Sequence, residues 1–385
     1  MLMLSNFSVR RPQYELRQKR ALDWLSEVHS LAEATLKGLT EPERAAFASR
    51  YAKLLERCAC GPERIGQRGH VSADLGSTTE LGLYDVRHFP HGQGSAARSL
   101  LFAQVVNAYF EREFATEEHA PSELIHVTCT GYVSPSGAQR LVADKGWGAL
   151  THVTHAYHMG CYAALPAILI AAGQLAVPKA FRPANSESRV DIVHTELCTL
   201  HLDPGDHSPE QCVVQSLFAD GFVRYSLREV SGGDEAAPGL ELLAVSERIL
   251  PDSADSMAWS VGDFGMRMTL MRDVPERIAS ALRPFVTELL AKRGFGVEAL
   301  RDAVVAVHPG GPKIIDRVSE VLELLPAQVQ TSRDVLFDYG NMSSATLPHV
   351  WQRVLADDAV RAGTLVLSLA FGPGLSVCGG LFRKH

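Results

Sequence analysis

The sequence lacks the excess of basic residues that nucleic-acid-binding domains usually carry. It contains 37 lysines and arginines against 44 aspartates and glutamates, a formal net charge of −7. Because nucleic acids are bound through basic surfaces, we expect no nucleic-acid partner. Long apolar runs are also missing: the run at residues 161–176 stops short of the ~18 residues that a membrane span requires, so we expect no membrane partner. The first residues lack the basic, apolar and small-residue order of a signal peptide, which favours a cytoplasmic location.

Paired cysteine motifs are missing as well. No C-x-x-C occurs, and Cys58 and Cys60 are too close together for an ordinary zinc pair. The odd count of seven cysteines favours reduced thiols, most of them buried as small apolar side chains. His152, His155 and His158 recur at intervals of three, but no carboxylate or cysteine set completes a ligand shell beside them. We therefore expect no metal site.

The chain is long and apolar enough to bury a large core, with 385 residues of which 46% are hydrophobic. Apolar residues at helical spacing predict helices at 14–39, 42–55, 96–115, 138–145, 161–176, 212–221, 275–292, 296–301, 312–324 and 348–361. Apolar runs predict strands at 123–131, 148–160, 188–197, 222–230, 239–250, 302–311 and 363–374, with 222–230 and 239–250 paired as a hairpin. Strands and helices alternate in both halves, which predicts an α/β fold.

Cys161 stands where a predicted strand meets the predicted helix 161–176, in the segment "HMGCYAALPAILIA". The first turn of a helix offers free N–H groups and the positive end of the helix dipole, which favour a thiolate. Gly160 permits a sharp turn before the cysteine, and small residues after it allow the helix to pack closely. Pro166 should bend this helix or make its start irregular. The pattern is typical of a nucleophile at a turn, although a buried filler cysteine explains it equally well.

His308 and Asn341 are the other candidates for chemistry. His308 follows an apolar strand in "AVHPGGP", where it can reach a shared pocket or simply bond to the backbone. Asn341, in "DYGNMSSA", can form a turn beside Gly340, or its side chain can donate a hydrogen bond to a carbonyl oxygen. Together with Cys161 they make a thiol nucleophile, a base and an oxyanion donor. A papain-like protease uses the same residue types, but its cysteine lies in a different local signature.

Four segments in a fixed order carry a resemblance to a known family: "HMGCYAALPAILIA", "VHPGGPKIIDRV", "DYGNMSSATLPHV" and "AFGPGLSV". Over nearly the whole chain the sequence resembles type III polyketide synthases, the chalcone and stilbene synthase family of the thiolase superfamily. The resemblance implies a five-layered αβαβα fold in two similar halves, residues 1–245 and 246–385, and a homodimer. It also implies decarboxylative condensation of an acyl-CoA with malonyl-CoA, with cyclisation to a pyrone or resorcinol and with no cofactor besides these coenzyme A thioesters.

The resemblance implies roles for individual residues. Cys161 would take the acyl group from coenzyme A. His308 and Asn341 would stabilise the thioester oxygen and the enolate left by loss of carbon dioxide, and His308 would hold Cys161 as a thiolate. Phe218 would lie at the pocket entrance. Gly372, Pro373 and Gly374 would form the back wall of the cavity, and Arg68 would meet the coenzyme A phosphates.

The sequence departs from the plant enzymes around the expected cavity. Met268 stands near the second entrance phenylalanine, His201 stands where the plant enzymes carry threonine, and Trp259 stands where many members have glycine. Tyr132 and the "SPSG" of residues 134–137 replace the plant "GVDMPG" loop. These changes suggest a bacterial-type member with a reshaped cavity. A bulky pocket would favour few extensions, or a starter lodged in a side tunnel.

Two other hypotheses stay open at this point. One is a single-condensation ketosynthase or acyltransferase that loads from an acyl carrier protein. The other is a catalytically silent scaffold that keeps the fold as a binding module, against which the intact Cys161, His308 and Asn341 argue.

Overall fold

The computed structural model describes residues 1–385 except 80–81, 184–186 and 231–237. Its centre is a sheet of nine strands in the order β11-β12-β13-β8-β1-β7-β6-β4-β5. The strands are β1 (Leu2–Arg10), β4 (Pro121–Thr128), β5 (His152–Tyr157), β6 (Glu187–Leu197), β7 (Asp220–Glu229), β8 (Leu240–Ile249), β11 (Val304–Val307), β12 (Leu365–Gly372) and β13 (Ser376–Lys384). The predicted α/β class is confirmed.

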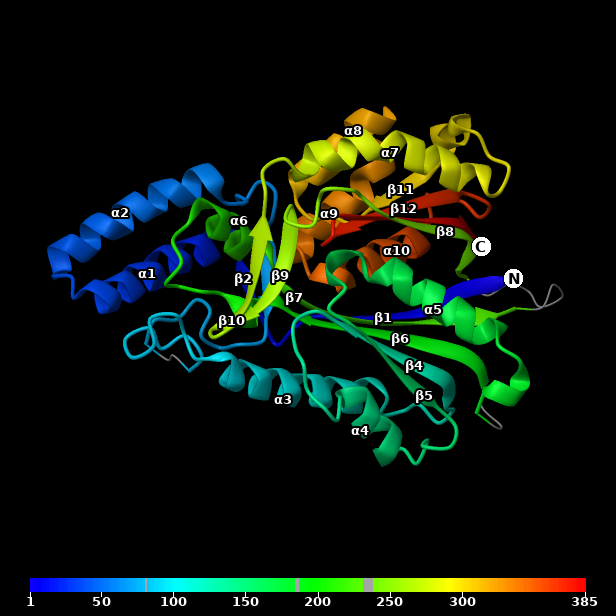
Figure 1. Ribbon diagram of the computed structural model, residues 1–385, viewed down its shortest axis with the longest axis horizontal. Helices are drawn as coiled ribbons and strands as arrows, with labels where there is room; N and C mark the ends of the chain where they lie inside the picture. Colours follow the sequence, from blue (N-terminus) through cyan, green and yellow to red (C-terminus); the bar gives the residue numbers. More distant parts are fainter. Residues whose placement is uncertain (80–81, 184–186, 231–237) are drawn as a thin grey trace.

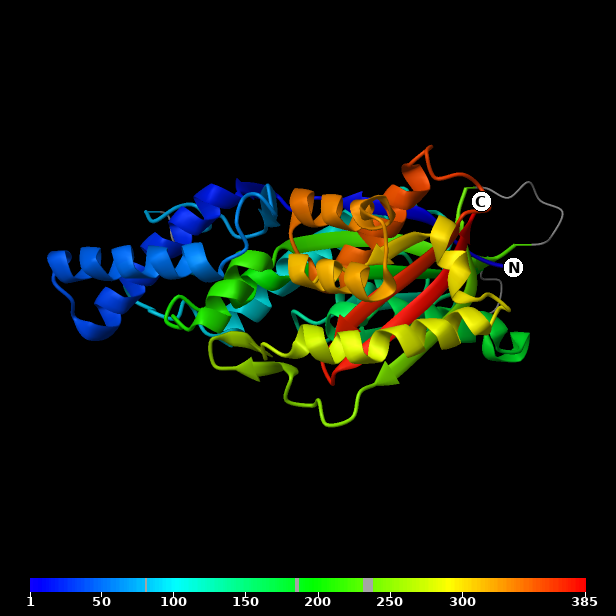
Figure 2. The ribbon, with the colours of Figure 1, turned by 90° about the horizontal axis from the view of Figure 1, so that it is seen from above.

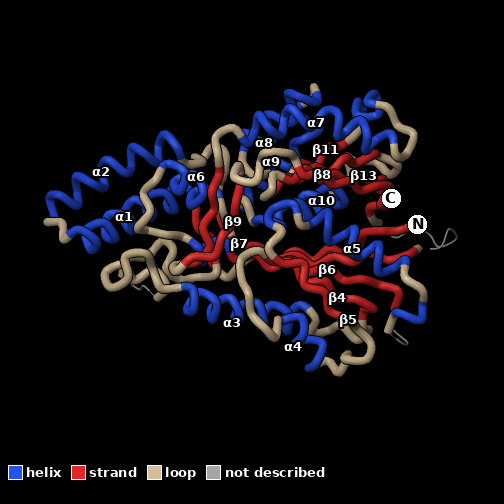
Figure 3. Tube along the Cα trace, in the orientation of Figure 1, coloured by secondary structure: helices blue, strands red, loops and turns tan. Residues whose placement is uncertain are grey.

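Helices sandwich the sheet in layers, as Figures 1 and 3 show. The β11-β12-β13-β8 part has helices α7 (Val274–Ala291) and α8 (Pro312–Leu322) on its outer side. The β1-β7-β6-β4-β5 part has α3 (Ser95–Glu113) and α4 (Gly137–Asp144) on its outer side. Between the two parts lie α5 (Ala164–Ala176) and α10 (Thr346–Ala356), so the arrangement is α-β-α-β-α.

The inner helix α5 carries several small side chains on the faces that pack against the sheet. Ala164, Ala167 and Ala171 are fully buried, and so are Leu165 and Ile168. Small side chains let the helix approach strands on two sides, while each buried leucine or isoleucine contributes about 1.5–3 kcal/mol. One apolar cluster therefore joins α5 and α10 to strands of both parts of the sheet.

An N-terminal helical pair extends from one end of the layers, as Figure 2 shows from above. Helix α1 (Gln18–Lys37) ends at Gly38, whose φ of 64° is the left-handed conformation that glycine adopts readily. Helix α2 (Glu41–Cys58) begins with a capping box between Thr40 and Glu43. Helix α6 (Pro209–Leu217) packs on the pair. The local signals at Gly38 and Pro42 predicted both helices, but the first was predicted from residue 14, and residues 14–17 form the strand β2 instead.

Other elements differ from the sequence predictions. The strands β7 and β8 do not form a hairpin, because β1 lies between them and pairs with both. The strands β1 and β13, the helix α9 (Gln330–Tyr339) and the small sheets β2–β3 and β9–β10 were not predicted. The predicted helix 212–221 ends at Leu217. Position 245, the proposed boundary between halves, lies inside β8, and the division into halves stays a prediction.

The two small sheets are β2 (Tyr14–Arg17) with β3 (Gln67–His70), and β9 (Met257–Gly262) with β10 (Gly265–Leu270). The β9–β10 hairpin stands beside α6 and the start of α3. Within the described residues, no helix combines the length and apolar character needed to span a membrane.

Candidate active site

Cys161 lies in a single 3₁₀ turn (Gly160–Tyr162) between β5 and α5. Gly160 precedes it with a φ of 76°, and a Cβ at that position would come within 2.7 Å of Pro373 Cδ. Only glycine meets both demands without strain. The predicted sharp turn before the cysteine is present, and it lets the loop after β12 close over Cys161.

A cavity of about 280 Å³ opens onto Cys161. Five residues predicted for the site line it, namely Cys161, Phe218, Trp259, Met268 and Pro373. The other lining residues are Cys129, Gly160, Cys198 and Ser343. These segments come from distant parts of the sequence, so the fold has gathered them.

The cysteine sulfur is buried, and burial raises the pKa of Cys161 to about 12. Hydrogen bonds from the side chains of Ser343 and Asn341 oppose this shift, and the charge of Glu196 adds to it. Ser343 Oγ lies 3.7 Å from the sulfur. Burial therefore outweighs the thiolate stabilisation that the sequence led us to expect from the helix terminus.

Asn341 is fixed by its backbone to the end of α6. Its N–H donates to Leu217 O at 3.0 Å, and its carbonyl oxygen accepts from Ala219 N at 2.8 Å. The side-chain Oδ1 accepts from Ser343 N at 2.9 Å. With Oδ1 occupied, the amide nitrogen is the atom left to act as a donor toward Cys161.

His308 follows β11 and is held by its own N–H, which donates to Leu369 O at 2.7 Å. Burial lowers the pKa of the imidazole to about 3, so the ring is neutral at neutral pH. Neither ring nitrogen has a hydrogen-bond partner among the described residues. An unpaired buried donor costs roughly 1–3 kcal/mol. The simple alternative of a loop histidine whose ring bonds to the backbone is therefore wrong.

The structure does not place every predicted residue in the Cys161 cavity. His308 is not among its lining residues, and no hydrogen bond links His308 to Cys161 in the part of the chain that is described. Gly372 and Gly374 flank the lining Pro373; a Cβ at Gly372 would meet Tyr162 Cδ1 at 2.2 Å. Gly372 therefore lets the turn pack against the segment that carries Cys161, whereas a Cβ at Gly374 would come nearest to Ser376 Oγ, at 3.2 Å.

His201 lies beyond the cavity, in the wall of a second one of about 440 Å³. Its Nε2 pairs with Thr130 O at 2.8 Å, and its Nδ1 accepts from Met266 N at 3.1 Å. Trp259 Nε1 donates to Cys129 O at 2.6 Å, and its ring meets His201 edge-on at 5.7 Å. His201 and Trp259 thus stand between the two cavities.

Arg68 does not fit the role expected from the resemblance. It is only 4% exposed, and its donors are taken by Gln18 Oε1 and by the carbonyl oxygens of Gln215 and Phe218. A guanidinium paired in this way cannot meet a coenzyme A phosphate at the surface. The assignment of Arg68 to phosphate binding is corrected: it fixes the backbone that leads into Phe218.

Sequence reasoning missed four residues around Cys161: Cys129, Glu196, Cys198 and Ser343. Three of them follow or end β4 and β6, which run parallel to each other and to β5. The carboxyl ends of parallel strands meet at one edge of a sheet, where α/β proteins place their sites. That rule, applied to strands 123–131, 148–160 and 188–197, was the available signal.

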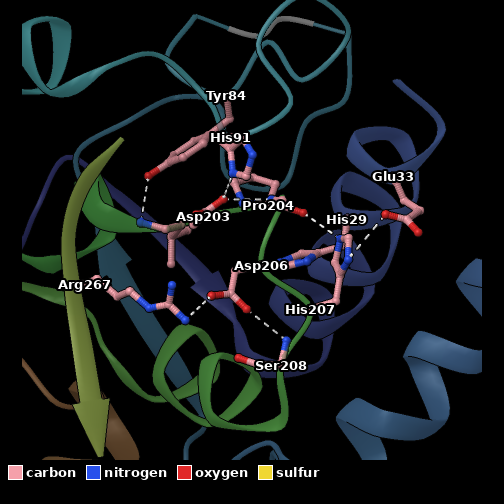
Figure 4. Close-up of polar contacts among 12 residues, drawn as sticks. His29, Glu33, Tyr84, His91, Asp203, Pro204, Asp206, His207, Ser208 and Arg267 are labelled. Carbon is pink, nitrogen blue, oxygen red and sulfur yellow. Dashed lines mark hydrogen bonds and ion pairs between the residues drawn. The ribbon is translucent and has the colours of Figure 1, made fainter. Parts of the chain in front are cut away.

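A polar cluster outside the cavity steadies the entrance, and Figure 4 shows its members. The loop before α6 carries Asp203 and Asp206. Asp203 Oδ1 pairs with His91 Nδ1 at 2.7 Å, and Asp206 pairs with Arg267 at 2.7 Å. Arg267 adjoins Met268 on β10, and α6 leads to Phe218. The loop therefore connects the segments that carry Phe218 and Met268, the two residues predicted for the pocket entrance.

Comparisons with known proteins bear on the family and the fold of this chain. A family model described as "Chalcone and stilbene synthases, C-terminal domain" matches residues 241–384. Type III polyketide synthase C of Arabidopsis thaliana is 31% identical over 271 residues, 68% of this chain and 67% of the relative. The 1,3,6,8-tetrahydroxynaphthalene synthase of Streptomyces coelicolor is 29% identical over 255 residues, 66% of this chain and 64% of that protein. The chain thus spans about two thirds of the length of these relatives.

A solved structure supports the fold over the full length. The C-terminal type III polyketide synthase domain of Steely1 from Dictyostelium superposes with a TM-score of 0.81, at 23% identity, covering 100% of this chain and 99% of that chain. The predicted thiolase-like fold is confirmed. The chain therefore belongs to the type III polyketide synthase family, whose members are acyltransferases that condense acyl-CoA with malonyl-CoA.

Proposed function

We propose that this chain extends an acyl-CoA starter with malonyl-CoA through a thioester on Cys161, by decarboxylative Claisen condensation. The observation that carries the proposal is the cavity around the Cys161 sulfur, where the Asn341 side chain reaches the sulfur. The buried His308 imidazole, with no protein partner for either nitrogen, supports it by offering an unused donor.

In the first step the Cys161 sulfur attacks the carbonyl carbon of the starter thioester. The acyl–sulfur bond to coenzyme A breaks, and the coenzyme A thiolate leaves with the proton from the cysteine. Negative charge grows on the thioester oxygen, so N–H donors fixed in advance lower the barrier. The Asn341 amide and the neutral His308 imidazole are the donors we assign to this oxygen.

In the second step malonyl-CoA loses its carboxylate as carbon dioxide, and the bonding electrons form an enolate. The enolate carbon attacks the acyl carbonyl on Cys161, which releases the sulfur and gives a β-ketoacyl-CoA. A neutral imidazole suits this step because it donates to the enolate oxygen while adding no charge to a dry site. The apolar lining from Phe218, Trp259 and Met268 excludes water.

The cavity dimensions bear on the product. The space beside Cys161 is small, because the bulky side chains of Phe218, Trp259 and Met268 fill much of its wall. This supports few extensions, with cyclisation to a pyrone or resorcinol. The second cavity supports the side-tunnel alternative: His201 and Thr130 in its wall already have their hydrogen-bond partners, so the free space suits an apolar chain end.

The remaining parts of the proposal concern partners. We infer a homodimer and a cytoplasmic location from the resemblance to the family. We infer no resident cofactor or metal, because the condensation needs only the chain's own side chains and the coenzyme A thioesters. An acyl carrier protein is the alternative acyl donor. Light scattering tests the dimer. Offering one acyl group on coenzyme A and on carrier protein, and comparing acylation of Cys161 by mass spectrometry, tests the donor.

The test of function incubates the full chain with a panel of acyl-CoAs and malonyl-CoA and identifies products by mass spectrometry. Wild type should release condensed products, and Cys161→Ala should release none. Cys58→Ala is the matched control, since Cys58 is half-buried and not among the residues that line the cavity. Condensation that persists in Cys161→Ala would overturn the proposal.

A further inference from the structure

The carboxyl end of helix α6 meets the segment that carries Asn341. A helix ends with backbone carbonyl oxygens that have no partner within the helix, and these need donors from elsewhere when they are buried. In α6 they belong to the buried residues Gln215, Ser216 and Leu217. Leu217 O accepts from Asn341 N at 3.0 Å. The backbone of Asn341 therefore provides one of the donors that close this helix.

Two buried side chains cap the other two carbonyl oxygens. Gln215 O accepts from Arg68 Nη1 at 2.9 Å, and Ser216 O accepts from Gln18 Nε2 at 2.7 Å. The two caps are joined, because Gln18 Oε1 accepts from Arg68 Nε at 2.8 Å. Burial lowers the pKa of Arg68 to about 10, so the guanidinium is charged at neutral pH. A cation at this place also opposes the negative end of the helix dipole.

Arg68 also holds the chain where it leaves α6. Its Nη1 donates to Phe218 O at 2.5 Å. The next residue, Ala219, donates from its N–H to Asn341 O at 2.8 Å. The backbone of Asn341 is thus bound on both sides of Phe218, through its N–H before that residue and through its carbonyl oxygen after it. Arg68 fixes the residue in between.

The stem of the Arg68 side chain packs against the Asn341 segment directly. A Cβ at Gly340, the residue before Asn341, would lie 2.9 Å from Arg68 Cγ and 3.2 Å from Leu217 O. Such a close approach shows that the arginine stem lies against the Gly340 backbone. One side chain therefore touches the segment of Asn341 and the helix end that binds it.

These contacts bear on the reaction because Asn341 and Cys161 come from separate segments. Cys161 stands between β5 and α5, and Asn341 stands between α9 and α10. The bond from Ser343 N to Asn341 Oδ1, at 2.9 Å, fixes the rotation of the amide. The distance of the amide from the sulfur depends on where the Asn341 backbone is held. A displacement of about 1 Å in an active site can lower a rate by roughly a hundredfold.

We propose that Arg68 and Gln18 are positioning residues, which cap α6 and thereby hold the Asn341 amide where it donates to the reacting oxygen. Without Arg68, the carbonyl oxygens of Gln215 and Phe218 would be buried without these donors, which is costly. The last turn of α6 would rearrange to find others. Because this helix end binds the Asn341 backbone, the amide would move with it.

The inference rests on the proposed function, so its test measures condensation of an acyl-CoA with malonyl-CoA by the full chain. Arg68→Met keeps an apolar stem and removes every donor. It should lower kcat on the order of tenfold and leave KM nearly unchanged, because it displaces a donor to developing charge and leaves the substrate contacts in place. Arg68→Lys keeps a cation that can reach Phe218 O, and it should recover part of the loss.

A double variant separates positioning of Asn341 from general damage to the fold. Asn341→Ala alone should lower kcat by roughly 10²–10³-fold, the usual loss for one donor to an oxyanion. Arg68→Met added to it should lower kcat by less than about twofold further, because the amide that Arg68 positions is already absent. Gln18→Leu removes the cap of Ser216 O and should show the same pattern with a smaller loss. If Arg68→Met does not fold, Gln18→Leu decides.

Lys384→Met is the matched control. Lys384 is also a buried cation, and its Nζ donates to the backbone carbonyl oxygens of Val354 and Asp357 at the end of α10. Among the described residues it makes no hydrogen bond to α6 or to Asn341. The variant should lose stability in thermal unfolding and keep the wild-type kcat per folded enzyme.

A wild-type kcat in folded Arg68→Met overturns the inference. A full further loss of the same size on top of Asn341→Ala also overturns it, because that loss would not pass through the amide. A raised KM at unchanged kcat overturns it as well and would point to the entrance at Phe218. All three results are read against an active wild type, so they leave the proposed function standing. A wild type that forms no condensed product with any acyl-CoA overturns the proposed function and this inference together.

Discussion

The wall between the two cavities gives the sharpest prediction about product size. Trp259→Ala removes the indole that separates a space of about 280 Å³ from one of about 440 Å³. Its loss should open the first space toward the second, because the indole ring meets His201, a residue in the wall of the second, edge-on. We therefore expect the variant to accept starters with longer acyl chains, or to add more malonyl units, than wild type does.

The stability cost of this change should be tolerable. Trp259 is half-buried on the small β9–β10 sheet, outside the nine-stranded sheet. Its loss removes the bond to Cys129 O, worth about 0.5–1.5 kcal/mol, together with part of the ring's packing. Replacing a fully buried tryptophan by alanine costs about 3–5 kcal/mol of stability, so we expect this variant to lose less than that. Thermal unfolding checks that the variant is folded before products are compared.

The assay compares product masses from a series of acyl-CoAs of increasing chain length. Met268→Ala is the control, because both residues line the first cavity but Trp259 also packs its ring against His201 in the wall of the second. It should enlarge the first cavity alone and change the product range less. If Trp259→Ala keeps the wild-type range while it remains folded and active, the wall does not limit chain length and the reasoning fails.

Three further predictions follow from named contacts. Gly160→Ala should lower the free energy of unfolding by about 1–3 kcal/mol, because its positive φ and the approach of Pro373 both oppose a Cβ; denaturant titration measures this. Arg68→Met should destabilise the fold by about 1–3 kcal/mol through unpaired buried carbonyl oxygens, yet leave KM for coenzyme A esters nearly unchanged in steady-state assays. Stability should fall as the pH drops from about 6.5 toward 3, since unfolding lets buried neutral histidines such as His126 and His308 take up protons; a His126→Gln variant should lose less stability over that interval in melts at several pH values.

The parts of the fold that the sequence predicted carry their own local signals. The helix α1 shows apolar spacing and a terminal Gly38, and α2 starts with Thr40, Pro42 and Glu43. The strands β1 and β13 carry no such local signals in their own sequences. The sequence of β13 contains two adjacent glycines, and it is a strand because β12 and β8 flank it on either side. Pairing between residues far apart in sequence decides such strands, and a single sequence does not display it.

The same distinction applies to the residues of the site: some are identified by local sequence, and others only by their contacts in space. Cys161, His308 and Asn341 stand in segments with distinctive sequence, so they could be singled out one by one. Arg68 was misassigned because burial cannot be read from a basic residue in a loop-like segment. Glu196 was missed because its importance comes from meeting other strand ends in space, which the sequence of "VHTELC" does not announce.

Burial explains why the Cys161 thiol and the His308 imidazole are both neutral before any substrate binds. Burial raises the pKa of Cys161 to about 12 and lowers that of His308 to about 3, so thiol and neutral imidazole are the resting forms at neutral pH. Transferring a proton from Cys161 to His308 would create two buried charges, which is favourable only when a partner compensates them. In the proposed reaction, a thioester carbonyl that accepts the free imidazole and amide hydrogens would provide that compensation as charge develops on its oxygen. The proposal therefore couples activation of the sulfur to the arrival of the substrate and does not require a thiolate beforehand.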